Sequence, residues 1–200
     1  INVINNPIDV KKISLLLCEE IDISLNTFSF VTIGRFHEQK NHMLMIESMK
    51  EIDAYLYIIG DGKLRAKLEQ KISKLGLKNK VYLLGRQLNP YKYISKADCF
   101  LFTSDYEGFP NVLLEALACG LPIISTDCPS GPREILAPYR ENEYGVLVPV
   151  NDKDALICSM KEMMTNHNLR EKYREKAQKR ADDFDKGRIV KKFITVMEKD

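Results

Sequence analysis

Short apolar runs alternate with longer stretches of mixed polarity from residue 28 onward. Six of these runs are apolar nearly throughout, at residues 28–35, 54–62, 81–85, 99–104, 122–127 and 144–150. Strands that are apolar throughout, rather than at every second position, are typical of parallel sheets covered by helices on both faces. The pattern therefore predicts buried parallel strands.

The stretches between and after the runs predict helices, because their apolar residues recur at helical spacing. They lie at residues 41–52, 63–76, 91–98, 111–120, 152–183 and 186–198. The long stretch at 152–183 is predicted to break near residues 166–168. Alternating strands and helices predict an α/β fold with a doubly wound sheet, in which ligands bind beyond the carboxyl ends of the strands. The segments to inspect are then 34–41, 60–63, 85–87 and 104–111.

The helix predicted at 111–120 carries only two strongly polar side chains, Asn111 and Glu115. They are four residues apart and therefore lie on one face of the helix. A carboxylate on a buried helix is costly unless it is paired or meets a polar ligand. This helix is therefore a candidate for ligand binding.

The residues just before this helix could add to the same site. Pro110 suits the first helical turn, so Gly108 and Phe109 precede a positive helix end suited to phosphate or sugar hydroxyls. Glu107 lies just upstream of them. On the residues alone, two interpretations stay open: a binding site with two carboxylates, or a solvated Glu107 and a salt bridge from Glu115 to a neighbouring helix.

The segment GRFHEQKN, at residues 34–41, supplies positive charge through Arg35 and Lys40. Arginine holds a phosphate through two N–H bonds, and lysine acts as a point charge. The spacing is not that of a P-loop, and GDGKLR at residues 60–65 does not complete the pattern GxGxxG. On the residues alone, surface cations are the favoured interpretation of this pair.

Composition excludes several functional classes. Thirty basic and 28 acidic side chains leave a net charge of +2, which gives no indication of a nucleic-acid partner. The five cysteines lie far apart without CxxC spacing and are expected to be reduced thiols. No apolar run approaches the roughly 20 residues of a membrane span, and the first residues lack the pattern of a signal peptide.

The sequence shows only weak patterns for a metal site or a catalytic nucleophile. His37 and His42 are five residues apart, and His167 is remote, so no metal site is expected. The sequence has no Asp-x-Asp cluster that could hold a magnesium–diphosphate. Ser104 and Ser125 lack a plausible His/Asp arrangement, which disfavours hydrolysis by a serine nucleophile.

Together, these segments resemble the donor-binding domain of family 4 glycosyltransferases, which have the GT-B fold. The resemblance runs from about Asn5 to Phe193. It is most specific at EGFPNVLLEALACGLPIISTDCPSGPREIL, residues 107–136, which holds two glutamates separated by seven residues. It implies a Rossmann-like doubly wound parallel sheet of about six strands, the C-terminal half of a GT-B enzyme. It also favours a functional role for both glutamates.

The resemblance implies roles for individual residues. Arg35 and Lys40 are similar to the pair that binds the donor diphosphate and acts in catalysis. Glu107 resembles a catalytic glutamate near the transferred sugar, and Glu115 resembles the acceptor for the ribose hydroxyls. Arg86 would lie near the base. The implied donor-binding residues are Gly34, Arg35, Lys40, Gly60, Asp61, Arg86, Glu107, Gly108, Phe109, Pro110, Asn111, Val112, Leu113 and Glu115, with backbone contacts expected over 109–113.

The implied activity is retaining transfer of a hexosyl or hexosaminyl group from a nucleotide-sugar, most often UDP-linked. The implied acceptor is a glycan or lipid-linked molecule in surface polysaccharide or glycoconjugate synthesis, with no cofactor, no metal and no nucleic acid involved. The alternatives are a nucleotide-sugar-binding module without turnover, or another GT-B enzyme such as a sugar-nucleotide epimerase. The segment GPREIL, at residues 131–136, favours the transferase.

The resemblance also divides the chain. Residues 1–24 are expected to be an interdomain linker with a leading helix, and residues 25–183 the donor-binding domain. Residues 184–200 are expected to form a C-terminal helix that packs on a missing N-terminal domain, which would bind the acceptor. The chain alone is thus expected to be an inactive fragment. The full-length protein is expected in the cytoplasm, where peripheral contact with the inner face of the membrane stays open.

Overall fold

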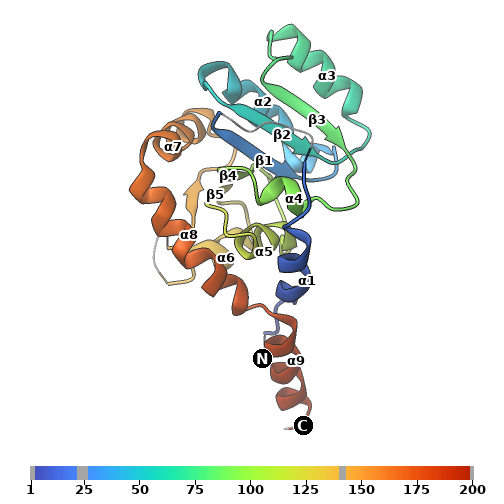
Figure 1. The fold of residues 1–200 in the computed structure, drawn as a ribbon, viewed down its shortest axis with the longest axis vertical. Helices are drawn as coiled ribbons and strands as arrows, with labels where there is room; N and C mark the ends of the chain where they lie inside the picture. The colour runs from blue at the N-terminus through green and yellow to red at the C-terminus, as the bar shows by residue number, and fades with distance from the viewer. Residues whose placement is uncertain (1–2, 22–26, 140–142, 199–200) are drawn as a thin grey trace.

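A six-stranded parallel sheet forms the centre of the computed structural model, which describes residues 3–21, 27–139 and 143–198 (Figure 1). The strands are β1 (Ser29–Ile33), β2 (Tyr55–Ile59), β3 (Val81–Gly85), β4 (Cys99–Phe102), β5 (Ile123–Thr126) and β6 (Val146–Val148). They lie in the order β3-β2-β1-β4-β5-β6, and every neighbouring pair is parallel. The predicted doubly wound sheet is confirmed. Its order reverses between β1 and β4, where such sheets bind ligands.

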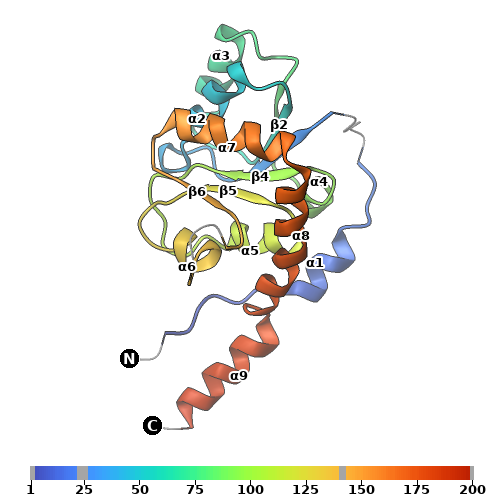
Figure 2. The same cartoon turned by 90° about the vertical axis from the view of Figure 1, so that its left-hand side faces the viewer.

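Helices cover both faces of the sheet (Figure 2). One face carries α2 (His42–Ser48), α3 (Arg65–Lys74) and α7 (Lys153–Thr165). The other carries α1 (Val10–Leu16), α4 (Tyr91–Ile94), α5 (Asn111–Ala118) and α6 (Pro132–Leu136). Two 3₁₀ turns, η1 (Glu38–Lys40) and η2 (Met49–Glu51), flank α2.

The strands are apolar throughout because consecutive side chains enter different cores. Phe30 and Leu56 belong to the core beneath α2 and α7, whereas their neighbours Val31 and Tyr57 belong to the core beneath α5. In a strand, successive side chains point to opposite faces. Both faces are covered here, so both sets of positions must be apolar.

The helix α8 (His167–Asp182) connects the two helical layers. Its Tyr173 packs in the first core and its Ala181 in the second. Arg174 Nη2 lies 3.9 Å from Oδ1 of Asp98, the residue just before β4. The helix therefore passes the amino ends of the strands and leaves the carboxyl ends open.

The last helix, α9 (Lys186–Met197), extends away from this body (Figures 1 and 2). Its start is fastened to the N-terminal segment of the chain. Ile8 N donates to the carbonyl of Phe184 at 2.9 Å, and Lys186 N donates to the carbonyl of Ile8 at 2.8 Å. Lys186 Nζ also lies 2.5 Å from Asp9 Oδ2. The segment before α1 and the start of α9 are therefore bound side by side.

The predicted elements are right in kind but differ in extent. The helix predicted at 41–52 is α2 followed by the turn η2, and the one predicted at 91–98 ends at Ile94. The predicted break is confirmed at Asn166, whose side chain accepts from Leu169 N and so starts α8. The five-residue α6 was not predicted.

The predicted leading helix is present as α1. The expected boundary between residues 24 and 25 falls within residues 22–26, outside the described residues.

Candidate functional site

Two glycines let the carboxyl ends of β1 and β2 lie close together. Gly60 has a φ of +144°, and a Cβ built on it would lie 2.0 Å from the carbonyl oxygen of Gly34. Gly34 N donates to the carbonyl of Ile59 at 3.0 Å. Only glycine fits both this φ and this gap. Both strands therefore end without side chains where ligands approach such a sheet.

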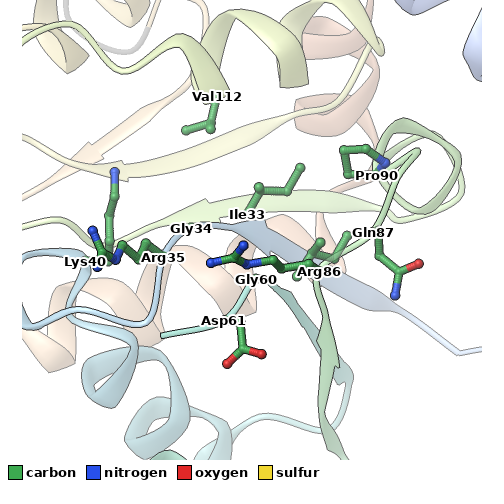
Figure 3. Close-up of a pocket in the computed structure, with 11 residues that line it drawn as sticks. Ile33, Gly34, Arg35, Lys40, Gly60, Asp61, Arg86, Gln87, Pro90 and Val112 are labelled. Carbon is green, nitrogen blue, oxygen red and sulfur yellow. The ribbon is translucent and has the colours of Figure 1, made fainter. Parts of the chain in front are cut away.

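A cavity of about 500 Å³ opens at these strand ends (Figure 3). It is lined by Ile33, Gly34, Arg35, Lys40, Ile59, Gly60, Asp61, Arg86, Gln87, Pro90 and Val112. All but Ile33, Ile59, Gln87 and Pro90 are site residues predicted from the sequence. Val112, at the start of α5, faces the strand ends across the opening (Figure 3).

Lys40 and Glu107 form an ion pair at the edge of this cavity. Lys40 Nζ lies 2.5 Å from Glu107 Oε1, and the two side chains are 20% and 11% exposed. The interpretation of Glu107 as a solvated carboxylate, and of Lys40 as an ordinary surface cation, is therefore wrong. Arg35 is exposed, and its guanidinium makes no hydrogen bond or ion pair with the described part of the chain. Its charge is available to an anion in the cavity.

Asp61 is held by its own neighbours. Arg65 Nε donates to Asp61 Oδ1 at 3.0 Å, and Gly62 N donates to the same oxygen at 2.8 Å. These hydrogen bonds, chiefly the one from Arg65, lower the pKa of Asp61. The carboxylate therefore stays ionised and links the start of α3 to the rim of the cavity.

Helix α5 begins at Asn111, as in the predicted range, but the place of Pro110 differs by one position from the prediction. Pro110 is not in the first turn but is the N-cap, because its carbonyl accepts from Leu113 N at 3.0 Å. The amides of Asn111 and Val112 are then the first of the helix and have no partner within it. They leave a positive helix end beside the cavity.

Glu115 lines a second cavity of about 370 Å³, together with Asn111, Leu88, Pro90 and Tyr91. Pro90 lines both cavities, so the two adjoin. Tyr91 Oη donates to Glu115 Oε1 at 3.3 Å. Among the described residues, this neutral hydroxyl stands where one of the two open interpretations had a salt bridge. Burial raises the pKa of Glu115, and the bond from Tyr91 opposes this shift only in part.

Several lining residues were missed by sequence reasoning. Leu88 and Tyr91 follow β3, and Asp9 and Lys12 belong to the segment around α1. The strand-end rule identified residues 85–87 and stopped one position short of the fully exposed Leu88. No pattern in the sequence brings α1 to face Glu115.

Five predicted site residues line neither cavity. Glu107 adjoins the first cavity only through its ion pair with Lys40, and the other four are Gly108, Phe109, Pro110 and Leu113. The ring of Phe109 packs on Phe184 with centroids 5.8 Å apart, and Leu113 is buried in the core. Their expected contacts run through the backbone, and this stays a prediction.

The described residues show neither a disulfide nor a metal site. All five cysteines are free thiols. Within the described ranges, no group of three or more His, Cys, Asp or Glu side chains could hold a metal ion. Over the same ranges no helix has both the length and the apolar character to cross a bilayer.

Comparison with known proteins identifies similar sequences. A family model described as Glycosyl transferases group 1 matches residues 19–180. An N-acetylgalactosamine-N,N'-diacetylbacillosaminyl-diphospho-undecaprenol 4-alpha-N-acetylgalactosaminyltransferase of Campylobacter jejuni is 38% identical, over 94% of this chain and 51% of its own length. An uncharacterized glycosyltransferase of Methanocaldococcus jannaschii is 35% identical, over 98% of this chain and 57% of its own length. The chain thus spans about half the length of these relatives.

Solved structures share the fold. The Anabaena protein Alr3699/HepE, in complex with UDP, superposes with a TM-score of 0.86 at 20% identity. The match covers 99% of this chain and 57% of that protein. The architecture predicted from the sequence, one half of a GT-B protein, is thereby confirmed.

Proposed function

The chain belongs to the group 1 family of glycosyl transferases, and we propose that it is the donor-binding half of a retaining enzyme that uses a UDP-linked sugar. The acceptor would be a glycan or lipid-linked saccharide of surface polysaccharide or glycoconjugate synthesis. The name of the Campylobacter relative, which gives an N-acetylgalactosaminyl group and a diphospho-undecaprenol, supports such an acceptor. The UDP in the Anabaena complex supports the base.

The observation that carries the proposal is the pair of adjoining cavities. The first is lined by the cations Arg35, Lys40 and Arg86, and the second by Glu115. A nucleoside diphosphate needs cations for its phosphates and an acceptor for its ribose hydroxyls, and it would span both cavities. The diphosphate would lie over the strand ends and the nucleoside between Leu88 and Glu115.

The same residues would assist the departure of the nucleoside diphosphate. When the bond from the sugar carbon to the diphosphate oxygen breaks, its electron pair stays on that oxygen and negative charge grows there. Arg35, Lys40 and the first amides of α5 would stabilise this charge where it develops. Lys40, through its ion pair with Glu107, and the amides at the start of α5 are held in place before the reaction, so these groups need little reorganisation.

Glu107 would face the transferred sugar. Its carboxylate is the partner of Lys40, so a bound diphosphate and Glu107 would share one ammonium group. A lysine ammonium has three hydrogen-bond donors and can serve both acceptors. In this arrangement Glu107 would lie beside the phosphate-linked end of the sugar.

Isothermal titration calorimetry with UDP tests the proposed site. We expect Arg35→Ala and Lys40→Ala each to weaken binding by roughly ten- to a hundredfold, because each removes one charge-assisted contact. Lys50→Ala, which removes an exposed cation from η2, is the matched control and should bind as wild type. Unchanged affinity in both site variants would overturn the assignment.

Two further measurements address the base and the need for metal. Thermal shifts with UDP-, GDP- and ADP-sugars at one concentration should be largest for the UDP series, because the ligand that binds the folded state most tightly raises its stability most. Arg35, Lys40 and the amides of α5 meet the diphosphate charge in our proposal. UDP affinity should therefore be the same in EDTA and in magnesium.

We also propose that α9 packs against a further domain that carries the acceptor site. Val190, Phe193, Ile194 and Met197 form an exposed apolar set on this helix. The relatives' additional length supports the existence of such a domain. The 200-residue chain would then bind nucleotide and transfer no sugar by itself.

A further inference from the structure

Asn41 joins three loops at the rim of the first cavity. Its Nδ2 donates to Asp105 Oδ1 at 2.9 Å and to Asn151 Oδ1 at 2.6 Å. Asp105 lies in the loop after β4, and Asn151 lies in the loop after β6. The loop that carries Lys40 is thus fastened by one side chain to two loops that are distant in sequence.

Further hydrogen bonds hold the first two loops together. Thr103 Oγ1 lies 3.1 Å from the carbonyl of Lys40 and 3.0 Å from that of Asn41. Gln39 Nε2 donates to the carbonyl of Tyr106 at 2.8 Å. The backbone on either side of Asn41 is therefore fixed against the segment that leads into Glu107.

The position of Asn41 has two requirements. Its φ of 45° is left-handed, a conformation that glycine, asparagine and aspartate adopt most readily among residues. Its two amide hydrogens meet two acceptors, and the Asp105 carboxylate can only accept, which fixes the amide orientation. Its Oδ1 accepts from Leu44 N at 3.4 Å and caps α2.

Other residues would satisfy only part of this set. Glycine would keep the backbone conformation but would lose every side-chain bond. Aspartate would keep the conformation and the cap on α2, since it is a good N-cap residue. However, it cannot donate, and its charge would repel Asp105.

We propose that Asn41 is a positioning residue, which sets the placement of Lys40 relative to Glu107 and thereby the affinity for the donor diphosphate. Lys40 directly precedes Asn41, and Glu107 follows Asp105 by two residues. The 2.5 Å ion pair between Lys40 and Glu107 therefore joins the same two loops that Asn41 joins through Asp105. Asn41 lines neither cavity described above and acts through Lys40. The inference rests on the proposed function, because it assumes that Lys40 binds the diphosphate.

Calorimetry with two probes, UDP and uridine, tests the inference on the 200-residue chain. Asn41→Asp should weaken UDP binding by about tenfold. Uridine lacks the diphosphate, so its affinity should not change. Asn166→Asp is the matched control: Asn166 caps α8 in the same way, away from the site, and this variant should bind both probes as wild type.

A double-mutant cycle shows whether Asn41 acts through Lys40. In a Lys40→Ala background, Asn41→Asp should weaken UDP binding no further. An additional tenfold loss there would mean that Asn41 acts independently of Lys40, and would overturn the inference. If Lys40→Ala weakens UDP binding but Asn41→Asp does not, the inference fails while the donor site stands. If Lys40→Ala itself has no effect, the proposed site fails.

Asn151→Gly covers the case in which Asn41→Asp does not fold. Asn151 has a φ of 60°, which glycine adopts freely, and the change removes one of the two acceptors of Asn41. UDP binding should weaken by about threefold with uridine unchanged, since a single neutral hydrogen bond is lost. Wild-type UDP affinity in a folded Asn151→Gly protein would contradict the inference.

Discussion

In our proposal, Glu115 combines a binding role with a cost to stability. It lies on the otherwise apolar α5, and Tyr91 is its hydrogen-bond donor among the described side chains. Burial favours the neutral form of a carboxyl group, which is why the pKa of Glu115 is raised. An ionised carboxylate in this place suits a ligand that brings its own donors, such as the two hydroxyls of a ribose.

Replacing Glu115 by glutamine should therefore stabilise the protein and impair binding. Because the pKa of Glu115 is raised on folding, the folded state holds its proton more tightly than the unfolded state does. The stability that this group contributes is present below the unfolded pKa and is lost as pH rises through the folded pKa. At pH 7 we expect Glu115→Gln to raise the thermal midpoint and to weaken UDP binding.

Denaturation and calorimetry at pH 7 measure both effects. The exposed Glu175 provides the control, since Glu175→Gln should change neither quantity. A Glu115→Gln protein that is less stable than wild type would show that the carboxylate is a structural element instead.

His42 should make the fold sensitive to acid. It is 2% exposed, and burial, with a smaller effect of the nearby Lys40 charge, lowers its pKa to about 4. Between pH 6.5 and about pH 4, His42 is protonated in the unfolded chain but stays neutral in the folded protein. The free energy of unfolding therefore falls as pH falls through this range. The loss should approach about 3 kcal/mol by pH 4.

Urea denaturation at pH 7, 5.5 and 4.5 measures this loss. His42→Gln should flatten the pH dependence of the unfolding free energy, even if it lowers stability at pH 7. His167→Gln removes an exposed histidine and should leave the slope as in wild type. An unaltered slope in His42→Gln would assign the acid sensitivity to other groups.

At the scale of elements, the local pattern of apolar residues predicts the strands well. It predicts short helices and the contacts between distant segments poorly. The strands could be predicted because burial on both faces leaves a continuous apolar run, as in β2. The five-residue α6 could not, since it is too short to show helical periodicity and begins at Pro132, directly after Gly131. The ion pair of Lys40 and Glu107 joins residues 67 positions apart, and no local pattern encodes that distance. Recognition of family motifs supplied the candidate site residues. Only the three-dimensional structure shows which of them contact each other.

The junction between β1 and β2 should tolerate no side chain at Gly60. Gly60→Ala adds a Cβ at a φ of +144° and within 2.0 Å of the Gly34 carbonyl oxygen, so it should lose at least about 2 kcal/mol of unfolding free energy. Gly76→Ala is matched to it, because Gly76 also has a positive φ, +70°, but has open space around it. That control should lose only about 1 kcal/mol. Equal losses in chemical denaturation would show that strain, and not the close approach, dominates at Gly60.

For the whole molecule, the two helical layers and α8 leave one edge of the sheet for ligands. The helix α8 occupies the amino ends of the strands, and both cavities lie toward the carboxyl ends of the strands. The helix α9 is the element least attached to this body (Figure 2). Its apolar face contributes little to the fold of the 200 residues.

Substitutions on α9 should separate docking from folding. Phe193 is 52% exposed, so Phe193→Ser should change the unfolding free energy by no more than about 0.5 kcal/mol and leave UDP affinity unchanged. Ile189, on the same helix but 8% exposed, is the contrast, and Ile189→Ser should lower stability clearly. Thermal denaturation of both variants checks this. A loss in Phe193→Ser as large as that in Ile189→Ser would mean that α9 packs on the domain itself.

The hydrogen bonds between Ile8 and the residues around Asp185 have a mechanical consequence if the further domain that we propose is present. A partner domain connected through both the N-terminal segment and α9 would be attached at a single point. Such an attachment would restrict translation of the partner domain but would permit it to rotate about a hinge at this point. A cleft over the strand ends would then open and close by swinging about this point. Because the displacement of the partner domain grows with distance from the hinge, a small rotation there would produce a large change in the opening of the donor cavity.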